Sequence, residues 1–167
     1  MTGDAAAREH DERYMMRALA LARAAAALGE VPVGAVIVHD GVIIGEGHNQ
    51  REAACSPLGH AELLAIEQAA RALARWRLVG ATLYVTLEPC FMCAGALVNA
   101  RVHRLVYGAI DAKAGAVASL ATVCSDARLN HRLVVDGGVL AEPCGEVLRS
   151  FFASKRARKG EPPPGGT

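Results

Sequence analysis

Apolar residues recur at two different spacings along this chain, and each spacing predicts a different kind of element. Over residues 11–28 they return every three or four positions, which is the period of one helix face, and Gly29 follows the last turn. Residues 33–38 and 42–47 are instead short runs rich in valine and isoleucine, separated by His39-Asp40-Gly41. Two such runs around a glycine-containing turn are typical of a β-hairpin. The first third of the chain therefore predicts a long helix followed by a hairpin.

The rest of the chain alternates between helical and strand patterns. Helices are expected at residues 60–74, 91–99 and 143–159, and strands at residues 82–86, 105–107 and 132–135. Residues 111–120 are rich in glycine and alanine and predict an irregular segment. The alternation predicts an α/β sandwich.

Composition agrees with one folded domain. The chain has 167 residues, of which 52% are hydrophobic, so it can bury a sizeable core. Only 4% are aromatic, so packing has to rely on small and aliphatic side chains. We expect a flexible N-terminus at residues 1–8, a single domain at 9–159, and a disordered tail at 160–167, which contains three consecutive prolines.

The expected cellular compartment follows from the lack of targeting and membrane-spanning segments and from the number of cysteines. No basic segment followed by an apolar block opens the sequence, and no stretch is apolar for long enough to span a bilayer. Five cysteines are an odd number, which fits a reducing compartment better than a disulfide framework. We therefore expect a cytoplasmic protein with no membrane partner.

Candidate chemistry lies in two separated segments, His60-Ala61-Glu62 and Pro89-Cys90-Phe91-Met92-Cys93. Histidine nitrogen and cysteine sulfur are preferred zinc ligands, and three protein ligands leave the fourth tetrahedral position open to water. Bound zinc lowers the pKa of that water, and Glu62 is placed to move protons. The pattern predicts a catalytic zinc site with His60, Cys90 and Cys93 as ligands, as in zinc nucleobase deaminases.

Both segments are expected at helix starts. Pro89 is tolerated in a first helical turn, and Cys90 and Cys93, three positions apart, then lie on one side of it. The partial positive charge of a helix N-terminus favours their thiolate form. His60 and Glu62 would be about 200° apart on a regular helix, so they share a site only where the helix begins.

A Cys-x-x-Cys pair also occurs in closed structural zinc sites and in redox dithiols. A closed zinc site needs a fourth ligand, but Cys55, Cys124 and Cys144 each stand alone, without a partner at ligand spacing. The other histidines show no ligand pattern either. The catalytic site is therefore the favoured interpretation.

Taken together with further motifs, these segments make the chain resemble the bacterial tRNA adenosine deaminases over nearly its whole length. The matching segments are Val31-Pro32-Val33-Gly34-Ala35-Val36, Gly47-His48-Asn49, His60-Ala61-Glu62, Thr82-Leu83-Tyr84-Val85-Thr86-Leu87-Glu88-Pro89-Cys90, Met92-Cys93-Ala94-Gly95-Ala96, Asp111-Ala112-Lys113, Asn130-His131-Arg132 and Phe151-Phe152. The histidine and cysteine motifs alone specify only the wider zinc-dependent cytidine and deoxycytidylate deaminase superfamily. The segments near residues 130 and 151 favour the tRNA branch.

The resemblance implies a three-layer α/β/α fold around a mixed five-stranded sheet, a homodimer, and one zinc ion per subunit. It also implies deamination of the wobble adenosine to inosine in the anticodon arm of a tRNA, with an arginine tRNA as the expected substrate. In such a reaction, zinc-activated water attacks C6 of adenine while Glu62 carries protons to N1 and to the departing amino group.

The resemblance also assigns substrate contacts. Asn49, the Ala61 backbone and the neighbourhood of Val33 would read the flipped base; the anticodon loop would be held by Asp111, Lys113, Asn130, His131 and Phe152. Two of these assignments have a simpler alternative. Asn49 follows a strand and could satisfy a turn with its own side chain, and Phe151 or Phe152 could be a core residue.

Charge adds little support for an RNA substrate. The formal net charge is only +1, so attraction for tRNA would depend on local clusters such as Lys155, Arg156, Arg158 and Lys159. The same run also suits an exposed helix end, where cations interact favourably with the helix dipole.

The sequence departs from the family pattern at Ser56-Pro57-Leu58-Gly59, before the histidine, and at Ile110, so contacts near these residues are expected to differ. Two rival functions share parts of the motif. A deaminase of a free nucleobase or nucleoside, of guanine or cytosine type, would use the same zinc site without an anticodon surface. A noncatalytic zinc-stabilised RNA-binding module would need a fourth protein ligand and no role for Glu62.

Overall fold

A five-stranded mixed sheet forms the centre of the molecule in the computed structural model, which describes residues 2–160 of the chain. The strands are β1 (Gly34–His39), β2 (Val42–His48), β3 (Thr82–Leu87), β4 (Arg104–Ala109) and β5 (Val134–Gly137). Their order in the sheet is β2-β1-β3-β4-β5. The first three strands pair antiparallel, whereas β3, β4 and β5 run parallel to one another. This sheet is the mixed five-stranded sheet that was expected.

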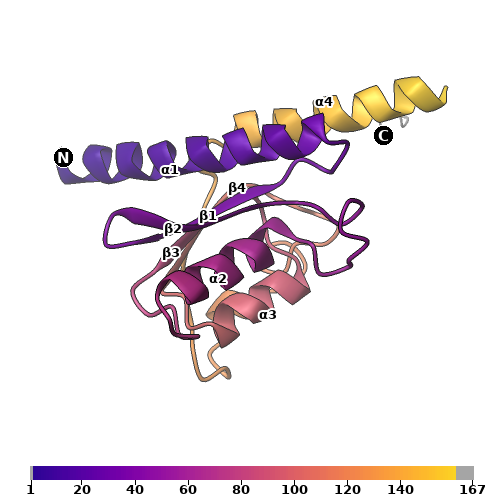
Figure 1. Cartoon of the computed structure of the whole chain (residues 1–167). Helices are drawn as coiled ribbons and strands as arrows, with labels where there is room; N and C mark the ends of the chain where they lie inside the picture. Colours follow the sequence, from indigo (N-terminus) through magenta and orange to yellow (C-terminus); the bar gives the residue numbers. More distant parts are fainter. Residues whose placement is uncertain (1, 161–167) are drawn as a thin grey trace.

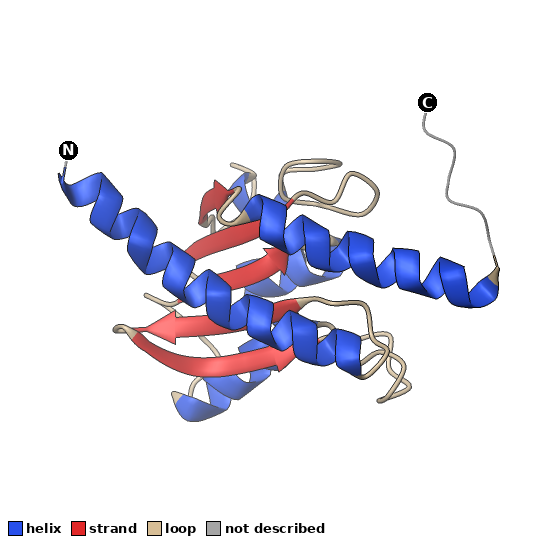
Figure 2. Cartoon of the chain, turned by 90° about the horizontal axis from the view of Figure 1, so that it is seen from above, coloured by secondary structure: helices blue, strands red, loops and turns tan. Residues whose placement is uncertain are grey.

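Helices cover both faces of the sheet, which gives three layers (Figure 1). One face carries α1 (Thr2–Ala27) and α4 (Ala141–Lys159), which lie side by side when seen from above (Figure 2). The other face carries α2 (Ala61–Ala72) and α3 (Phe91–Asn99). Each face has its own apolar cluster, and the one beneath α2 and α3 is the larger. The three-layer α/β/α architecture is therefore confirmed.

Small residues bring helix α2 very close to strand β2. A Cβ atom on Gly45 would lie 2.3 Å from the Ala65 carbonyl oxygen, and one on Gly47 would lie 2.3 Å from the Ala61 carbonyl oxygen. Neither position can accept a side chain without displacing the helix. The low aromatic content thus corresponds to close helix-to-strand packing, and this packing fixes the start of α2.

A partly buried ion-pair network attaches α1 to the sheet. The Arg104 guanidinium donates two hydrogen bonds of 2.8 Å to the Asp11 carboxylate and one of 2.7 Å to Asp136. The Tyr84 hydroxyl donates a further bond of 2.9 Å to Asp11. Because α1 would otherwise be held mainly by alanine and other apolar contacts, this network fixes its position along the sheet.

The elements match the sequence expectations in type and order, and they differ at several boundaries. Helix α1 begins at Thr2, whereas the helix was expected to begin at residue 11; the flexibility of residues 1–8 stays a prediction. Strand β5 begins two residues later than expected. Pro89 lies just before the Cys90 N-cap of α3 rather than inside its first turn, so it precedes the helix instead of starting it. Gly160 ends α4 in the left-handed region, and the rest of the expected tail lies outside the described residues.

The expected hairpin turn between β1 and β2 is present. Asp40 and Gly41 both have positive φ, of 50° and 75°. Two consecutive positive values are what a two-residue hairpin turn of type I′ requires.

Among the described helices, none has the length and apolar character needed to cross a membrane.

Candidate metal centre and pocket

Two helix starts meet at one end of the sheet and bring the two sequence motifs together. His60 is the N-cap of α2 and Cys90 is the N-cap of α3, and both caps have extended backbone. Glu62 lies in the first turn of α2. His60 and Glu62 can therefore share one site, as the helical geometry required. The cysteines follow β3 directly, so the sheet places the second motif opposite the first.

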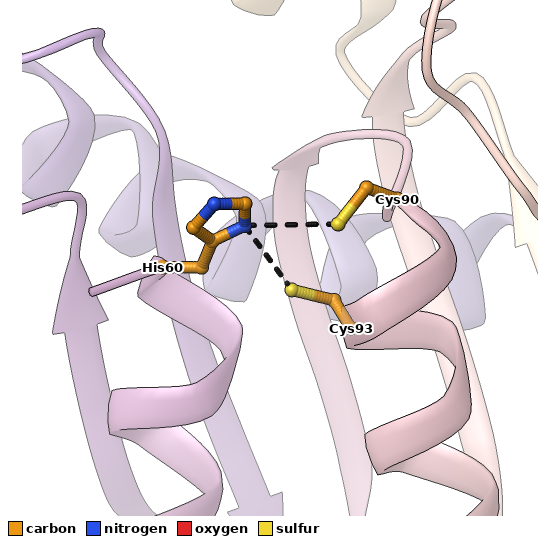
Figure 3. A group of neighbouring side chains, drawn as sticks. All are labelled: His60, Cys90 and Cys93. Atoms are coloured by element: carbon orange, nitrogen blue, oxygen red, sulfur yellow. Dashed lines mark hydrogen bonds between the residues drawn. The ribbon is translucent and has the colours of Figure 1, made fainter. Parts of the chain in front are cut away.

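The three expected metal ligands converge without any other residue between them. The His60 Nδ1 atom lies 3.4 Å from the Cys93 Sγ atom and 3.7 Å from the Cys90 Sγ atom (Figure 3). All three donor atoms lie within 4.8 Å of one another. Within residues 2–160, no other histidine, cysteine or carboxylate joins this group. The group therefore offers three protein donors, which is the number typical of an open catalytic site rather than a closed structural one.

Charge within the group is shared through hydrogen bonds. Hydrogen bonds from Cys93 and from His60 lower the pKa of Cys90 to about 3. Hydrogen bonding to Cys90 and burial raise the pKa of Cys93. The hydrogen bond to Cys90 also raises the pKa of His60. A bound divalent metal ion would favour the thiolate form of both cysteines.

Glu62 is a buried carboxyl group beside this donor set. It is only 4% exposed, and burial raises the pKa of its carboxyl group. A carboxyl group whose pKa is raised toward neutrality can both accept and donate a proton, which suits general acid–base chemistry.

A cavity of about 200 Å³ opens over the donor set. The expected site residues that line it are Val33, Asn49, His60, Ala61, Glu62, Cys90 and Asp111. Sites for drug-sized ligands usually have about 300–1,000 Å³. The cavity is therefore small enough to favour a single planar ring system over a larger ligand.

Asn49 lines the cavity but is also committed to its own loop. Its amide nitrogen donates to the Val31 carbonyl at 3.2 Å, and its side-chain oxygen accepts a bond of 3.2 Å from the Arg51 backbone N–H. The turn-forming alternative is thus present in the structure. One N–H and one lone pair of the amide remain for a ligand, so the two roles are compatible.

The other expected RNA contacts lie outside this cavity. Lys113 is exposed on the segment after β4. Asn130 and His131 line a separate groove, and the His131 ring lies 2.7 Å from the Val102 carbonyl oxygen. Phe152 is 43% exposed on α4 and packs edge-on against the half-buried Phe151. The structure therefore groups Val33, Asn49, Ala61 and Asp111 around the cavity. Lys113 lies beside this lining, whereas Asn130, His131 and Phe152 lie elsewhere on the surface.

Five further residues line the cavity and were not singled out in advance: Val31, Arg51, Leu87, Glu88 and Ala114. Glu88 carries a signal that was available in the sequence, because it is a carboxylate directly after an apolar strand. Hydrogen bonds from Ser119, Asp111 and Ala118 outweigh the effect of burial and lower its pKa to about 2. Glu88 is therefore charged at neutral pH although it is almost fully buried.

Comparison with known proteins identifies relatives over most of the chain. The model of the MafB19-like deaminases matches residues 9–156. The tRNA-specific adenosine deaminase of Bacillus subtilis is 50% identical over 149 residues, which cover 89% of this chain and 92% of that protein.

Two solved structures are similar in fold. One comes from studies of A-to-I editing by tRNA:A34 deaminases; it is 43% identical, has a TM-score of 0.79, and is matched over 81% of this chain and 99% of that one. The other is a guanine deaminase from Nitrosomonas europaea, with 25% identity, a TM-score of 0.75, and coverage of 85% of this chain and 84% of that one.

Proposed function

This chain belongs to the family of tRNA-specific adenosine deaminases, and on this premise we propose that it converts the wobble adenosine of a tRNA anticodon to inosine. In this reaction, water replaces the amino group at C6 of adenine and ammonia leaves. The observation that carries the proposal is a small cavity in which a buried carboxyl group, Glu62, lies beside a His/Cys/Cys donor set.

The donor set fits zinc. One imidazole nitrogen and two thiolate sulfurs are ligands that zinc prefers, and their close grouping needs no rearrangement of the backbone. His60, Cys90 and Cys93 would hold one ion per subunit. When bound, zinc would lower the pKa of a water molecule at the open position and so supply a nucleophile at neutral pH.

Glu62 is proposed to be the catalytic acid and base. Its carboxylate would take a proton from the attacking water and deliver it to N1 of adenine. It would then carry the remaining proton of that water from the new C6 hydroxyl to the departing amino group. Its position in the first turn of α2, two residues after His60, places it at the donor set. Burial keeps competing water away from the carboxyl group.

The cavity would read the base. Asn49 and the Ala61 backbone can form hydrogen bonds to the edge of adenine, and Val33 can pack against its face. Because the cavity is small, the ribose and phosphates would remain at its mouth. The base therefore has to leave the stack of the anticodon loop before it can react.

The remaining partners and contacts are part of the proposal. Asp111, Lys113, Asn130, His131 and Phe152 would contact the anticodon loop, and two copies of the chain would form a homodimer. An arginine tRNA is the expected substrate. The reaction would take place in the cytoplasm, where the three cysteines outside the metal site would remain reduced.

A guanine deaminase is the second candidate, because a protein of that activity shares the fold at a TM-score of 0.75. It would use the same donor set and a base-sized cavity. It would not need an RNA surface, so activity on a free base separates the two functions.

The test is deamination of four substrates by the purified protein. The substrates are a tRNA with a wobble adenosine, the same tRNA with a wobble cytidine, free adenosine and free guanine. We expect inosine only in the first, measured by nucleoside analysis and ammonia release. Product from free guanine, with none from tRNA, would instead establish the second candidate. A Glu62→Gln protein serves as the inactive control.

A further inference from the structure

One wall of the cavity is an irregular segment, residues 111–119, that follows β4. We call it the 111–119 wall. It contributes Asp111 and Ala114 to the cavity lining and carries the exposed Lys113. It contains no helix or strand, and only an isolated bridge pairs Gly115 with Cys90. Something other than regular secondary structure therefore has to fix its conformation.

The buried carboxylate of Glu88 holds this wall from beneath. Glu88 Oε1 accepts hydrogen bonds from the backbone N–H groups of Val117 at 3.2 Å, Ala118 at 2.7 Å and Ser119 at 2.8 Å. Glu88 Oε2 accepts one from the Asp111 N–H at 2.9 Å and one from the Ser119 hydroxyl at 2.6 Å. Both ends of the wall thus converge on one side chain that is 2% exposed.

The wall is shaped to admit this carboxylate. A Cβ atom on Gly115 would lie 2.3 Å from the Glu88 carboxyl group, so the wall can close over Glu88 only with glycine at this position. The Ala116 N–H also donates to the Pro89 carbonyl at 2.9 Å. Within the described residues, no lysine or arginine forms an ion pair with Glu88. Its charge is balanced by five donors of the wall, and such charge-assisted bonds are stronger than neutral ones.

The reacting groups are held differently. His60, Glu62, Cys90 and Cys93 are fixed by the starts of α2 and α3, which pack on the sheet. The wall, in contrast, has no helix or strand; besides the bonds within it and the buried Ala116 and Val117, five hydrogen bonds to Glu88 join its two ends. A change at Glu88 should therefore move the surface that meets the substrate more than it moves the groups that react.

We propose that Glu88 is a positioning residue that holds the 111–119 wall in the conformation that receives the RNA substrate. This inference rests on the proposed function, because it assigns the wall to substrate binding. Glu88 does not take part in the chemistry, since both of its oxygens are already occupied by the wall.

The test is the Glu88→Gln protein. An NH₂ group replaces one carboxylate oxygen there, so a hydrogen-bond donor faces the N–H donors of the wall and cannot accept their bonds. We expect amide hydrogen exchange in a peptide spanning the wall to become at least ten times faster, while a peptide spanning α2 is unchanged. With a tRNA carrying a wobble adenosine, KM should rise at least tenfold and kcat should fall less than threefold. The zinc content should equal that of the wild type.

Two variants serve as controls. Ser119→Ala removes one of the five donors and keeps the carboxylate, so its exchange rate and KM should lie between those of the wild type and Glu88→Gln. Asp11→Asn disturbs a buried carboxylate on the opposite face of the sheet and should lower stability without changing KM.

Three results would overturn the proposal: unchanged exchange in the wall, a large fall in kcat with KM unchanged, or loss of zinc from Glu88→Gln. Loss of zinc would mean that Glu88 instead supports the turn that carries Cys90 and Cys93. If the wild type deaminates no tRNA, the proposed function fails, whereas the exchange and zinc measurements still decide whether Glu88 holds the wall.

Discussion

Replacement of Glu62 by glutamine should separate catalysis from stability. Glutamine has nearly the same shape as glutamate but cannot carry a proton between water and substrate. The side chain is 4% exposed and is not one of the three grouped metal donors. Glu62→Gln should therefore leave the cavity and the metal ligands in place and remove only the proton transfers.

The expected magnitude follows from the number of steps that use this carboxyl group. A positioned general acid or base typically contributes about 10²–10⁴-fold in rate. Glu62 is proposed to act in several proton transfers of one turnover, so kcat should fall by at least about 10³-fold, which corresponds to about 4 kcal/mol of transition-state stabilisation. Stability should not fall in parallel, because folding buries an ionisable carboxyl group here and a neutral amide is cheaper to bury. We expect the free energy of unfolding to stay within about 0.5 kcal/mol of the wild type or to rise.

Single-turnover conversion of an anticodon stem-loop, with excess protein, measures the chemical step directly. Urea denaturation and zinc analysis of the same preparation provide the two controls. Residual activity above about one tenth of the wild type would show that Glu62 is not the proton carrier. Loss of activity together with loss of zinc would show a structural role at the metal site instead.

Three further predictions concern the metal, the ion-pair network and the close packing of α2. Dialysis against a chelator should abolish deamination, and one equivalent of zinc per subunit should restore it, as measured by activity and metal analysis; activity that survives metal removal would contradict the assigned donor set. Asp11→Asn should lower the free energy of unfolding by about 3 kcal/mol, the low end for a broken buried pair because Arg104 keeps Asp136, as measured by urea denaturation at pH 7. Burial alone would raise the pKa of Asp11, but hydrogen bonds from Arg104 and Tyr84 lower it below its ordinary value of 3.8. The stability that the ionised Asp11 contributes is therefore present above pH 3.8 and is lost as the pH falls toward the folded-state pKa. The difference in unfolding free energy between wild type and Asp11→Asn should shrink over that acidic range and not at alkaline pH. Gly45→Ala should lower stability by at least about 2 kcal/mol, because its methyl group would meet the Ala65 carbonyl at 2.3 Å, and a change below about 0.5 kcal/mol in thermal or urea unfolding would show that α2 can move away freely.

The sequence by itself predicted the order of the elements and the candidate metal donors that the structure groups together. Periodicity and turn residues located the hairpin and all four helices, because these depend on neighbours within a few positions. The donor set was also readable, since Cys90 and Cys93 are three apart and His60 carries a carboxylate two residues later. Such short spacings constrain geometry even before the fold is known.

Tertiary structure alone decided which distant residues share the cavity. Glu88 and its donors are separated by 23 to 31 positions, and they meet only because β3 and β4 run parallel and their following segments leave the same edge of the sheet. The same packing placed Asp111 in the cavity and left Asn130 and His131 in another groove. No local pattern contains this information, because contacts between distant segments depend on strand order and on how closely the helices pack.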